Sequence, residues 1–149
     1  MGDYTYRSIT FRLHPGSRTR HTLLTQTAGA CRWIWNQSLA HNKAQYAWFK
    51  EGKAEKPSVS FQSMGVWFTR LRKETDWLQT LPYAPIRYTL KYQADAWRKT
   101  FNGAGFPRFK CRCGDEGFTI AQHVKVQGGS LYIPKIGWMK INRKGGQPL

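Results

Sequence analysis

The sequence is poor in acidic residues. Its 149 residues include 8 Asp and Glu against 24 Lys and Arg, so the formal net charge is +16 at pH 7. Mutual repulsion in such a chain opposes compaction unless a polyanion relieves it. The basic residues are spread along the chain among many aromatics, whereas a membrane surface would favour one basic amphipathic helix or a polybasic tail. This pattern predicts a nucleic-acid partner, through phosphate contacts and base stacking, and no membrane partner.

Long apolar runs and cysteines are scarce as well. No run approaches the roughly 18 apolar residues of a membrane span, and the N-terminus lacks the apolar core of a signal peptide. The three cysteines, Cys31, Cys111 and Cys113, are an odd number, which argues against a disulfide framework. We therefore expect a reducing, cytoplasmic location.

Acids arranged for catalysis are also lacking. A two-metal nuclease needs carboxylates that converge from separate strands. Asp115 and Glu116 flank strand-like sequence, but as neighbours they would point to opposite sides of an extended chain. The sequence contains no evident nucleophile–base pair and no phosphate-binding glycine loop. We expect no catalysis by this chain alone and no cofactor.

Residues that could bind zinc are also few. Cys111, Cys113 and His123 are weak candidates, because the cysteines follow a C-x-C spacing rather than the C-x₂-C that suits a zinc turn. A second pair of ligands is missing. The favoured interpretation is two ordinary thiols in a basic loop, with no metal.

Helical and strand patterns occupy separate parts of the chain. Residues 4–13 alternate in polarity and predict a strand, and short strands are predicted again over 116–126, 129–137 and 138–144. Residues 74–82 are predicted to be a linker. Between the strands, four helices are predicted: 18–29 with Ser17 as cap and an interruption at Gly29, 30–49, a helix capped by Ser60 that reaches Leu71, and Tyr83–Phe101 with Trp97 and Phe101 in its core face. Such segregation indicates an α+β fold or a helical insertion in a small β-barrel.

Five segments together resemble one known family. They are "FRLHP" at 11–15, "GACRWIWN" at 29–36, "TDWLQTLP" at 75–82, "AWRKTFNGAGFPRFK" at 96–110 and "SLYIPKIGWMKI" at 130–141. In this order they resemble the TnpB family, the OrfB proteins of small insertion sequences and relatives of type V CRISPR effectors. His14 stands where the family usually has tyrosine.

The resemblance implies a fold and a division of labour. Members are RNA-guided DNA endonucleases, in which a small wedge β-barrel carries an inserted helical recognition lobe. Residues 1–15 would be the first wedge strand, 16–103 a four-helix, helix-turn-helix-like lobe, and 104–149 the remaining strands of an incomplete barrel. The family's RuvC-like nuclease, with its metal-binding Asp, Glu and Asp, and its four-cysteine zinc ribbon follow downstream, so we expect both to be absent here.

The basic residues give the strongest functional signal. Arg87, Lys91 and Arg98 share one face of the last predicted helix, where Asp95 alone opposes them. An arginine can also contact a guanine edge with two hydrogen bonds. Further cations that we expect to face phosphate are Arg108 and Lys110, beside the stiffening Pro107, and Lys135, Lys140 and Arg143 on the late strands.

The resemblance adds residues to this set. In the family, recognition helices and a wedge strand read the duplex next to the target, and the matching positions are Ser63, Tyr83, Arg87 and Thr119. Arg32 and Asn36 match a family motif: we expect Arg32 to meet RNA or phosphate, and Asn36 either to do so or to hold a neighbouring loop.

These observations predict a non-catalytic part of a TnpB-like protein that binds DNA and a structured guide RNA. A separate chain or a continuation would carry the nuclease. Three alternatives remain open at this point, namely a stand-alone truncated DNA-binding regulator of a transposable element, an active hydrolase with an unfamiliar site, and a degraded reading frame without function.

Overall fold

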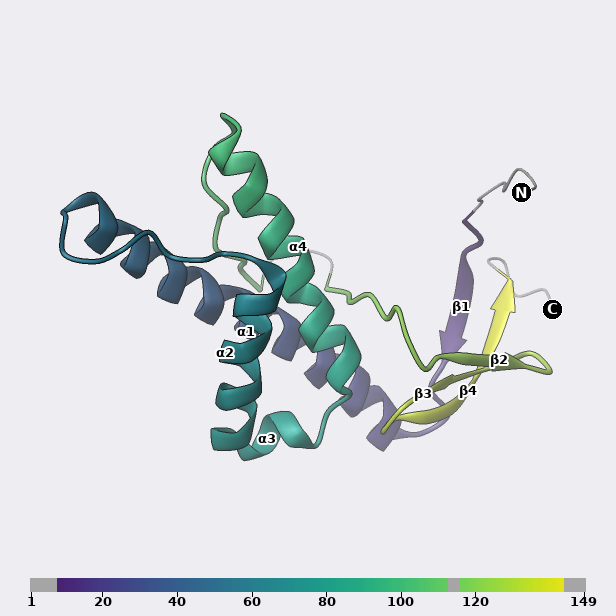
Figure 1. Cartoon of the computed structure of the whole chain (residues 1–149). Coiled ribbons are helices and arrows are strands. Elements are labelled where there is room, and N and C mark those ends of the chain that lie inside the picture. The colour runs from purple at the N-terminus through teal and green to yellow at the C-terminus, as the bar shows by residue number, and fades with distance from the viewer. Residues whose placement is uncertain (1–7, 113–115, 144–149) are drawn as a thin grey trace, which may run out of the picture.

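Figure 1 shows the computed structural model of the chain, which describes residues 8–112 and 116–143. The predicted segregation of helices and strands is confirmed, because a helical part precedes most of a four-stranded sheet. The elements in chain order are β1 (Phe11–His14), α1 (Arg18–Lys50), α2 (Phe61–Glu74), α3 (Asp76–Gln79), α4 (Tyr83–Phe101), β2 (Lys125–Gln127), β3 (Ser130–Ile133) and β4 (Gly137–Arg143). None of the helices in these ranges has an apolar stretch long enough to cross a bilayer.

Helix α1 is a single helix of 33 residues. Ser17 caps it as predicted, with its hydroxyl accepting a hydrogen bond from the backbone N–H of Arg20. The predicted interruption at Gly29 is wrong. A glycine inside a helix costs only about 1 kcal/mol relative to alanine, and the neighbouring Ala30 and Ile34 are buried against the rest of the helical core. Tertiary packing therefore carries the helix through the glycine.

The predicted linker over 74–82 contains the short helix α3. It buries Leu78, and Leu81 follows it into the same core. Ser60 caps α2 as predicted. The helical part thus has four helices, but they are not the four that the sequence predicted.

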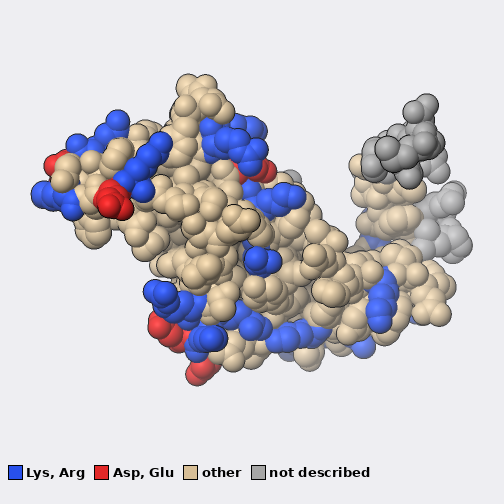
Figure 2. Space-filling view, viewed as in Figure 1, with Lys and Arg blue, Asp and Glu red and all other residues tan. Residues whose placement is uncertain are grey.

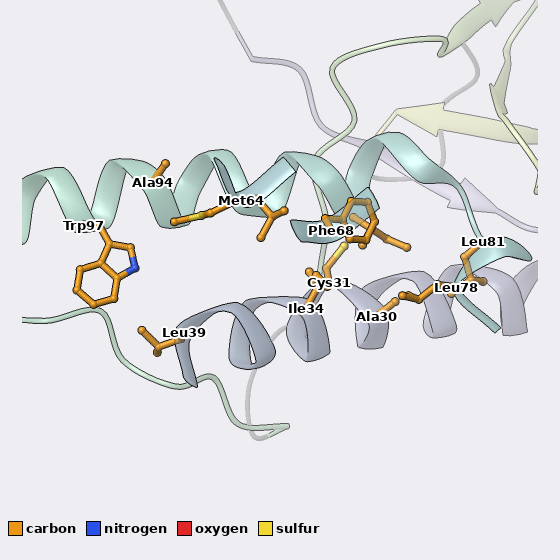
Figure 3. Packing of buried hydrophobic residues seen from close by; sticks show 12 residues of the cluster. Ala30, Cys31, Ile34, Leu39, Met64, Phe68, Leu78, Leu81, Ala94 and Trp97 are labelled. Atoms are coloured by element: carbon orange, nitrogen blue, oxygen red, sulfur yellow. The ribbon is translucent and has the colours of Figure 1, made fainter. Parts of the chain in front are cut away.

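Helix α4 packs along α1 and closes the main core. Figure 3 shows Ile34 and Leu39 from α1 and Trp97 from α4 pointing into the space between the two helices. A buried polar group helps to join them: the Gln93 side-chain amide donates to the carbonyl of Trp35 at 2.8 Å. Gln93 is fully buried, so this satisfied hydrogen bond fixes how the two helices face each other.

The sheet is antiparallel throughout, in the order β1-β4-β3-β2. Within the described residues β1 and β2 are its free edges, so the strands do not close into a barrel. The long strand predicted over 116–126 is also wrong, because pairing begins only at Lys125. Residues 4–7 of the strand predicted over 4–13 lie outside the described residues.

A second, smaller core lies under the sheet. It contains Ile133, Ile136 and Met139, with Leu13 and Leu23 packed against it. Leu23, near the start of α1, also contacts the main core. Figure 1 accordingly shows the sheet beside the N-terminal end of α1, while the loop after α1 lies at the far end of the molecule.

Candidate nucleic-acid interface

A groove of about 770 Å³ runs along the outer face of α4, between the start of α2 and residues 121–122. Four of the residues predicted to bind nucleic acid line it, namely Tyr83, Arg87, Lys91 and Arg98. They come together because they share one face of one helix. We call this hollow the α4 groove. Figure 2 shows Lys and Arg side chains over the helical part of the molecule, with few acidic side chains among them.

Arg87 is held in the α4 groove by packing. Its guanidinium carbon lies 4.9 Å from the centroid of the Phe61 ring. On α2, a Cβ added to Gly65 would come within 3.3 Å of an Arg87 guanidinium nitrogen, so the glycine makes room for the cation. No carboxylate in residues 8–112 or 116–143 forms an ion pair with Arg87. Its positive charge is thus positioned but not neutralised.

Lys91 and Arg98 continue the cationic side of the groove. The Lys91 ammonium lies 5.2 Å from the centroid of the Tyr88 ring. Arg98 donates to Asp95 at 3.0 Å, as expected for an acid one helical turn away. Among the described residues that line the groove, Asp95 is the only acidic one. Exposed pairs of this kind contribute about 1 kcal/mol or less and are screened by salt. Arg98 can therefore leave Asp95 for another anion at little cost.

Aromatic rings form much of the rest of the wall. Phe61, Tyr83, Tyr88 and Phe101 all line the groove. Phe101, predicted to belong to the core, is 40% exposed and lies at the rim under the Lys56 ammonium. It is the last residue of α4, so the core no longer covers it. Neither Phe61 nor Lys56 could be predicted from the pattern of α4, because Phe61 lines the groove from α2 and Lys56 reaches Phe101 from the loop before α2.

The segment "GFPRFK" at 105–110 lies along α1. The indole N–H of Trp35 donates to the carbonyl of Arg108 at 2.8 Å. Asn36 donates to the carbonyl of Lys110 at 2.9 Å and accepts from its N–H at 2.8 Å. The Lys110 ammonium in turn lies 4.2 Å from the centroid of the Trp35 ring. This is the loop-holding geometry that we considered for Asn36, and it fixes the backbone that carries Arg108 and Lys110.

Cations and rings alternate along this segment too. Lys43 of α1 lies 5.1 Å from the centroid of the exposed Phe109 ring, and Phe106 packs edge-on against Trp97 at 5.9 Å. Arg108 is exposed. Lys43 could not be predicted from the sequence pattern, because only the fold brings α1 against this loop.

Arg32 has a protein partner. It forms an ion pair with Glu116, and both side chains remain partly exposed. The pair lies beside a second hollow of about 290 Å³ that Thr119 also lines. Thr119 and Tyr92 are joined through their hydroxyls at 3.3 Å. The expected contact of Arg32 with RNA or phosphate stays a prediction, and any such contact would have to compete with Glu116.

Ser63 does not line the α4 groove, although its hydrogen-bond partner Ser60 does. Its hydroxyl is hydrogen-bonded to those of Ser58 at 2.6 Å and Ser60 at 3.0 Å, beside a hollow of about 260 Å³ that His41 also lines. The structure therefore does not place Ser63 with Tyr83 and Arg87, although all three match family positions.

The cations on the sheet have separate places. The Lys135 ammonium donates to the carbonyl of Gln79, which ties the turn after β3 to α3. Lys140 is exposed on β4. Arg143 ends β4, and its side chain lies outside the described residues.

The cysteines differ in environment. Burial raises the pKa of the Cys31 thiol to about 11, opposed in part by a hydrogen bond with Thr89 and by the charge of Lys110. Cys111 is disulfide-bonded, so its interpretation as an ordinary free thiol is wrong. Cys113 lies outside the described residues. Among those that are described, His123 included, no three His, Cys, Asp or Glu side chains gather as metal ligands would.

Residues 1–53 match a family described as the helix-turn-helix domain of OrfB proteins of the IS605 type. This match covers the first 53 of the 149 residues. A second comparison agrees: the putative RNA-guided DNA endonuclease InsQ of Escherichia coli K12 is 30% identical over 139 residues, which are 90% of this chain and 33% of InsQ. The chain thus spans about a third of the length of this relative. The predicted resemblance to the TnpB/OrfB family is confirmed.

The structure qualifies the description of the OrfB domain. Its described part, residues 8–53, contains β1 and the uninterrupted helix α1, with no turn between two helices. The groove-lining residues of α4 and the 105–110 segment lie beyond the matched range. The helix-turn-helix label therefore does not identify which helix would meet a ligand.

Proposed function

We propose that the chain binds nucleic acid through the α4 groove, as the non-catalytic N-terminal part of a TnpB-like RNA-guided endonuclease. Target-flanking duplex DNA would contact the groove, and structured guide RNA would contact the basic surface around it. The observation that carries the proposal is the convergence of Arg87, Lys91 and Arg98 with aromatic walls in one hollow, with Asp95 as the opposing acid.

The geometry of the cations supports phosphate binding. At a helical rise of 1.5 Å per residue, the backbone positions of Arg87 and Lys91 lie about 6 Å apart along the axis of α4, and that of Arg98 follows about 10 Å further. Three fixed cations on one line suit a polyanion better than a single small anion. The Arg87 guanidinium and the Lys91 ammonium rest on rings, which leaves N–H donors available at their edges.

Three of the described acids support a binding role. Asp95, Glu116 and Glu51 each form an ion pair with a neighbouring basic side chain. Such acids reduce repulsion among cations. Bond cleavage, which the name of InsQ assigns to that relative, would then belong to a continuation or to a separate chain that carries the nuclease.

The sheet supports the proposed wedge with an inserted recognition lobe. β1 precedes the helices and the other strands follow them, yet β1 pairs directly with β4 over the register from Phe11–Arg143 to His14–Lys140. The helices are therefore inserted within one sheet. We propose that this open sheet is part of a wedge barrel, which strands from elsewhere would complete.

Binding assays with the 149-residue chain test the proposal. Fluorescence anisotropy would compare the binding of duplex DNA in the presence and absence of a structured RNA transcribed from the transposable element that encodes the chain. The proposal expects RNA-dependent DNA binding that weakens in the Arg87→Ala variant. DNA binding that is identical without RNA would instead favour a stand-alone regulator. A folded chain that binds neither nucleic acid at low salt would refute both.

A further inference from the structure

The outward face of the sheet carries a second aromatic and basic surface, remote in sequence from α4. Cross-strand pairing aligns Lys125 on β2 with Tyr132 on β3, and Tyr132 with Trp138 on β4. The Tyr132 and Trp138 rings lie 5.4 Å apart between centroids, and the Lys125 ammonium lies 5.5 Å from the Tyr132 ring. Trp138 is 40% exposed.

The same register places more cations on this face. His14 on β1 pairs with Lys140 on β4, and Arg12 pairs with Asn142 two residues along each strand. Since side chains alternate between the faces of a strand, Arg12, Lys140 and Trp138 share one side. Arg12 and Lys140 are exposed. We call the surface formed by Arg12, Lys125, Tyr132, Trp138 and Lys140 the outer sheet face.

The opposite side of the sheet is already occupied. Leu131 pairs with Met139, and Leu13 with Ile141, one position out of phase with the outer residues. Leu13, Leu131 and Met139 belong to the core under the sheet. The exposed Trp138 and the half-buried Tyr132 are thus not displaced core residues. They lie on the solvent side of strands whose other side is filled.

We propose that the outer sheet face binds single-stranded nucleic acid, with unpaired bases stacked on Tyr132 and Trp138 and phosphates held by Arg12, Lys125 and Lys140. A sheet face with two adjacent rings can stack bases only where they are unpaired, because a duplex hides the faces of its bases. The four strands contain no Asp or Glu. That one-sided charge favours a polyanion, whereas protein-binding surfaces are usually depleted in lysine. The inference shares with the proposed function only the class of ligand.

Photocrosslinking locates the contact without any substitution. The 149-residue chain would be irradiated with an oligonucleotide of about eight nucleotides that carries 5-iodouracil. Parallel RNA and DNA versions would show which backbone is preferred. The proposal expects crosslinked peptides that contain Tyr132 or Trp138. Crosslinks confined to Tyr83 and Tyr88 would place single strands in the α4 groove and overturn it.

Variants then measure the contribution of the rings. Trp138→Leu should weaken binding of the oligonucleotide roughly 5- to 150-fold, while Trp138→Phe, which keeps a stacking surface, should restore most of it. Trp48→Leu is the matched control, because Trp48 is an exposed tryptophan on α1 away from the sheet. Circular dichroism would confirm that each variant is folded.

The outcomes separate this inference from the proposed function. Equal binding by the chain and by Trp138→Leu, with both folded, contradicts the stacking role but leaves the α4 groove standing. If binding of the oligonucleotide falls as much in Trp138→Phe as in Trp138→Leu, the stacking role is contradicted as well. Duplex binding that falls with Arg87→Ala but not with Trp138→Leu is expected if both surfaces act as described.

Discussion

Asn36 binds both backbone polar groups of Lys110, with its amide donating at 2.9 Å and its carbonyl accepting at 2.8 Å. The Asn36 side chain on α1 therefore forms, with a residue 74 positions away, the same pair of hydrogen bonds that a residue of a neighbouring strand would form. The pair anchors the 105–110 segment, whose cations we expect to face phosphate.

Asn36→Ala should release this segment. Removing two hydrogen bonds that are partly open to water should lower the free energy of unfolding by about 1 to 2 kcal/mol. Trypsin should also cleave faster after Arg108 and Lys110, because the loop can open locally. Urea denaturation and timed proteolysis measure the two effects. The exposed neighbour Gln37→Ala is the control, and equal cleavage rates for both variants would contradict the anchoring role.

Arg87→Lys separates charge from geometry. Lysine keeps one positive charge but cannot present the planar pair of donors that stacks on Phe61. We expect the salt dependence of duplex binding to persist while discrimination between flanking sequences falls by about 1 to 3 kcal/mol. Competition binding across a panel of duplexes measures this. A uniform loss over all sequences would show that Arg87 contacts phosphate without reading a base edge.

Gly65→Ala tests whether the glycine positions Arg87. The added Cβ would lie 3.3 Å from the guanidinium, so the cation must shift, whereas helix propensity alone favours alanine by about 1 kcal/mol. We expect unchanged or higher stability together with weaker duplex binding. In the control Gly29→Ala, the new Cβ would lie 3.8 Å from Arg32. Equal duplex binding by both variants would argue against the positioning role.

The Cys31 thiol should make stability fall at high pH. Its pKa is raised from 9.0 to about 11 in the folded chain, so the native state keeps the proton that the unfolded state loses. The contribution is present below pH 9 and falls by roughly 2 kcal/mol as the pH rises towards 11. Urea denaturation of the chain and of Cys31→Ala over this range isolates the thiol, since tyrosines and lysines titrate there in both. Parallel pH profiles would refute the assignment.

Local signals in the sequence predicted the local features of the fold. Ser17 and Ser60 cap helices, and α4 ends where the glycines begin, because each depends on a few neighbouring residues. The interruption at Gly29 failed for the opposite reason. Whether a glycine breaks a helix depends on what the flanking residues bury, and that is decided by α4, more than fifty residues away.

The candidate site divides in the same way. Tyr83, Arg87, Lys91 and Arg98 converge because helical periodicity places them together. The partners of other residues do not follow from any period: Glu116 beside Arg32 and Phe61 beneath Arg87 come from separate elements. The outer sheet face depended on strand register, which the sequence patterns left undefined.

The salt dependence of duplex binding tests the central claim, that the cations of the α4 groove hold a polyanion. The measurement is a plot of log K against log salt concentration for the chain and for the variant with Arg87, Lys91 and Arg98 all changed to alanine. We predict a steep negative slope for the chain and a slope smaller by about one for each phosphate contact removed. A flat plot for the chain, or equal slopes for the two folded proteins, would contradict the account.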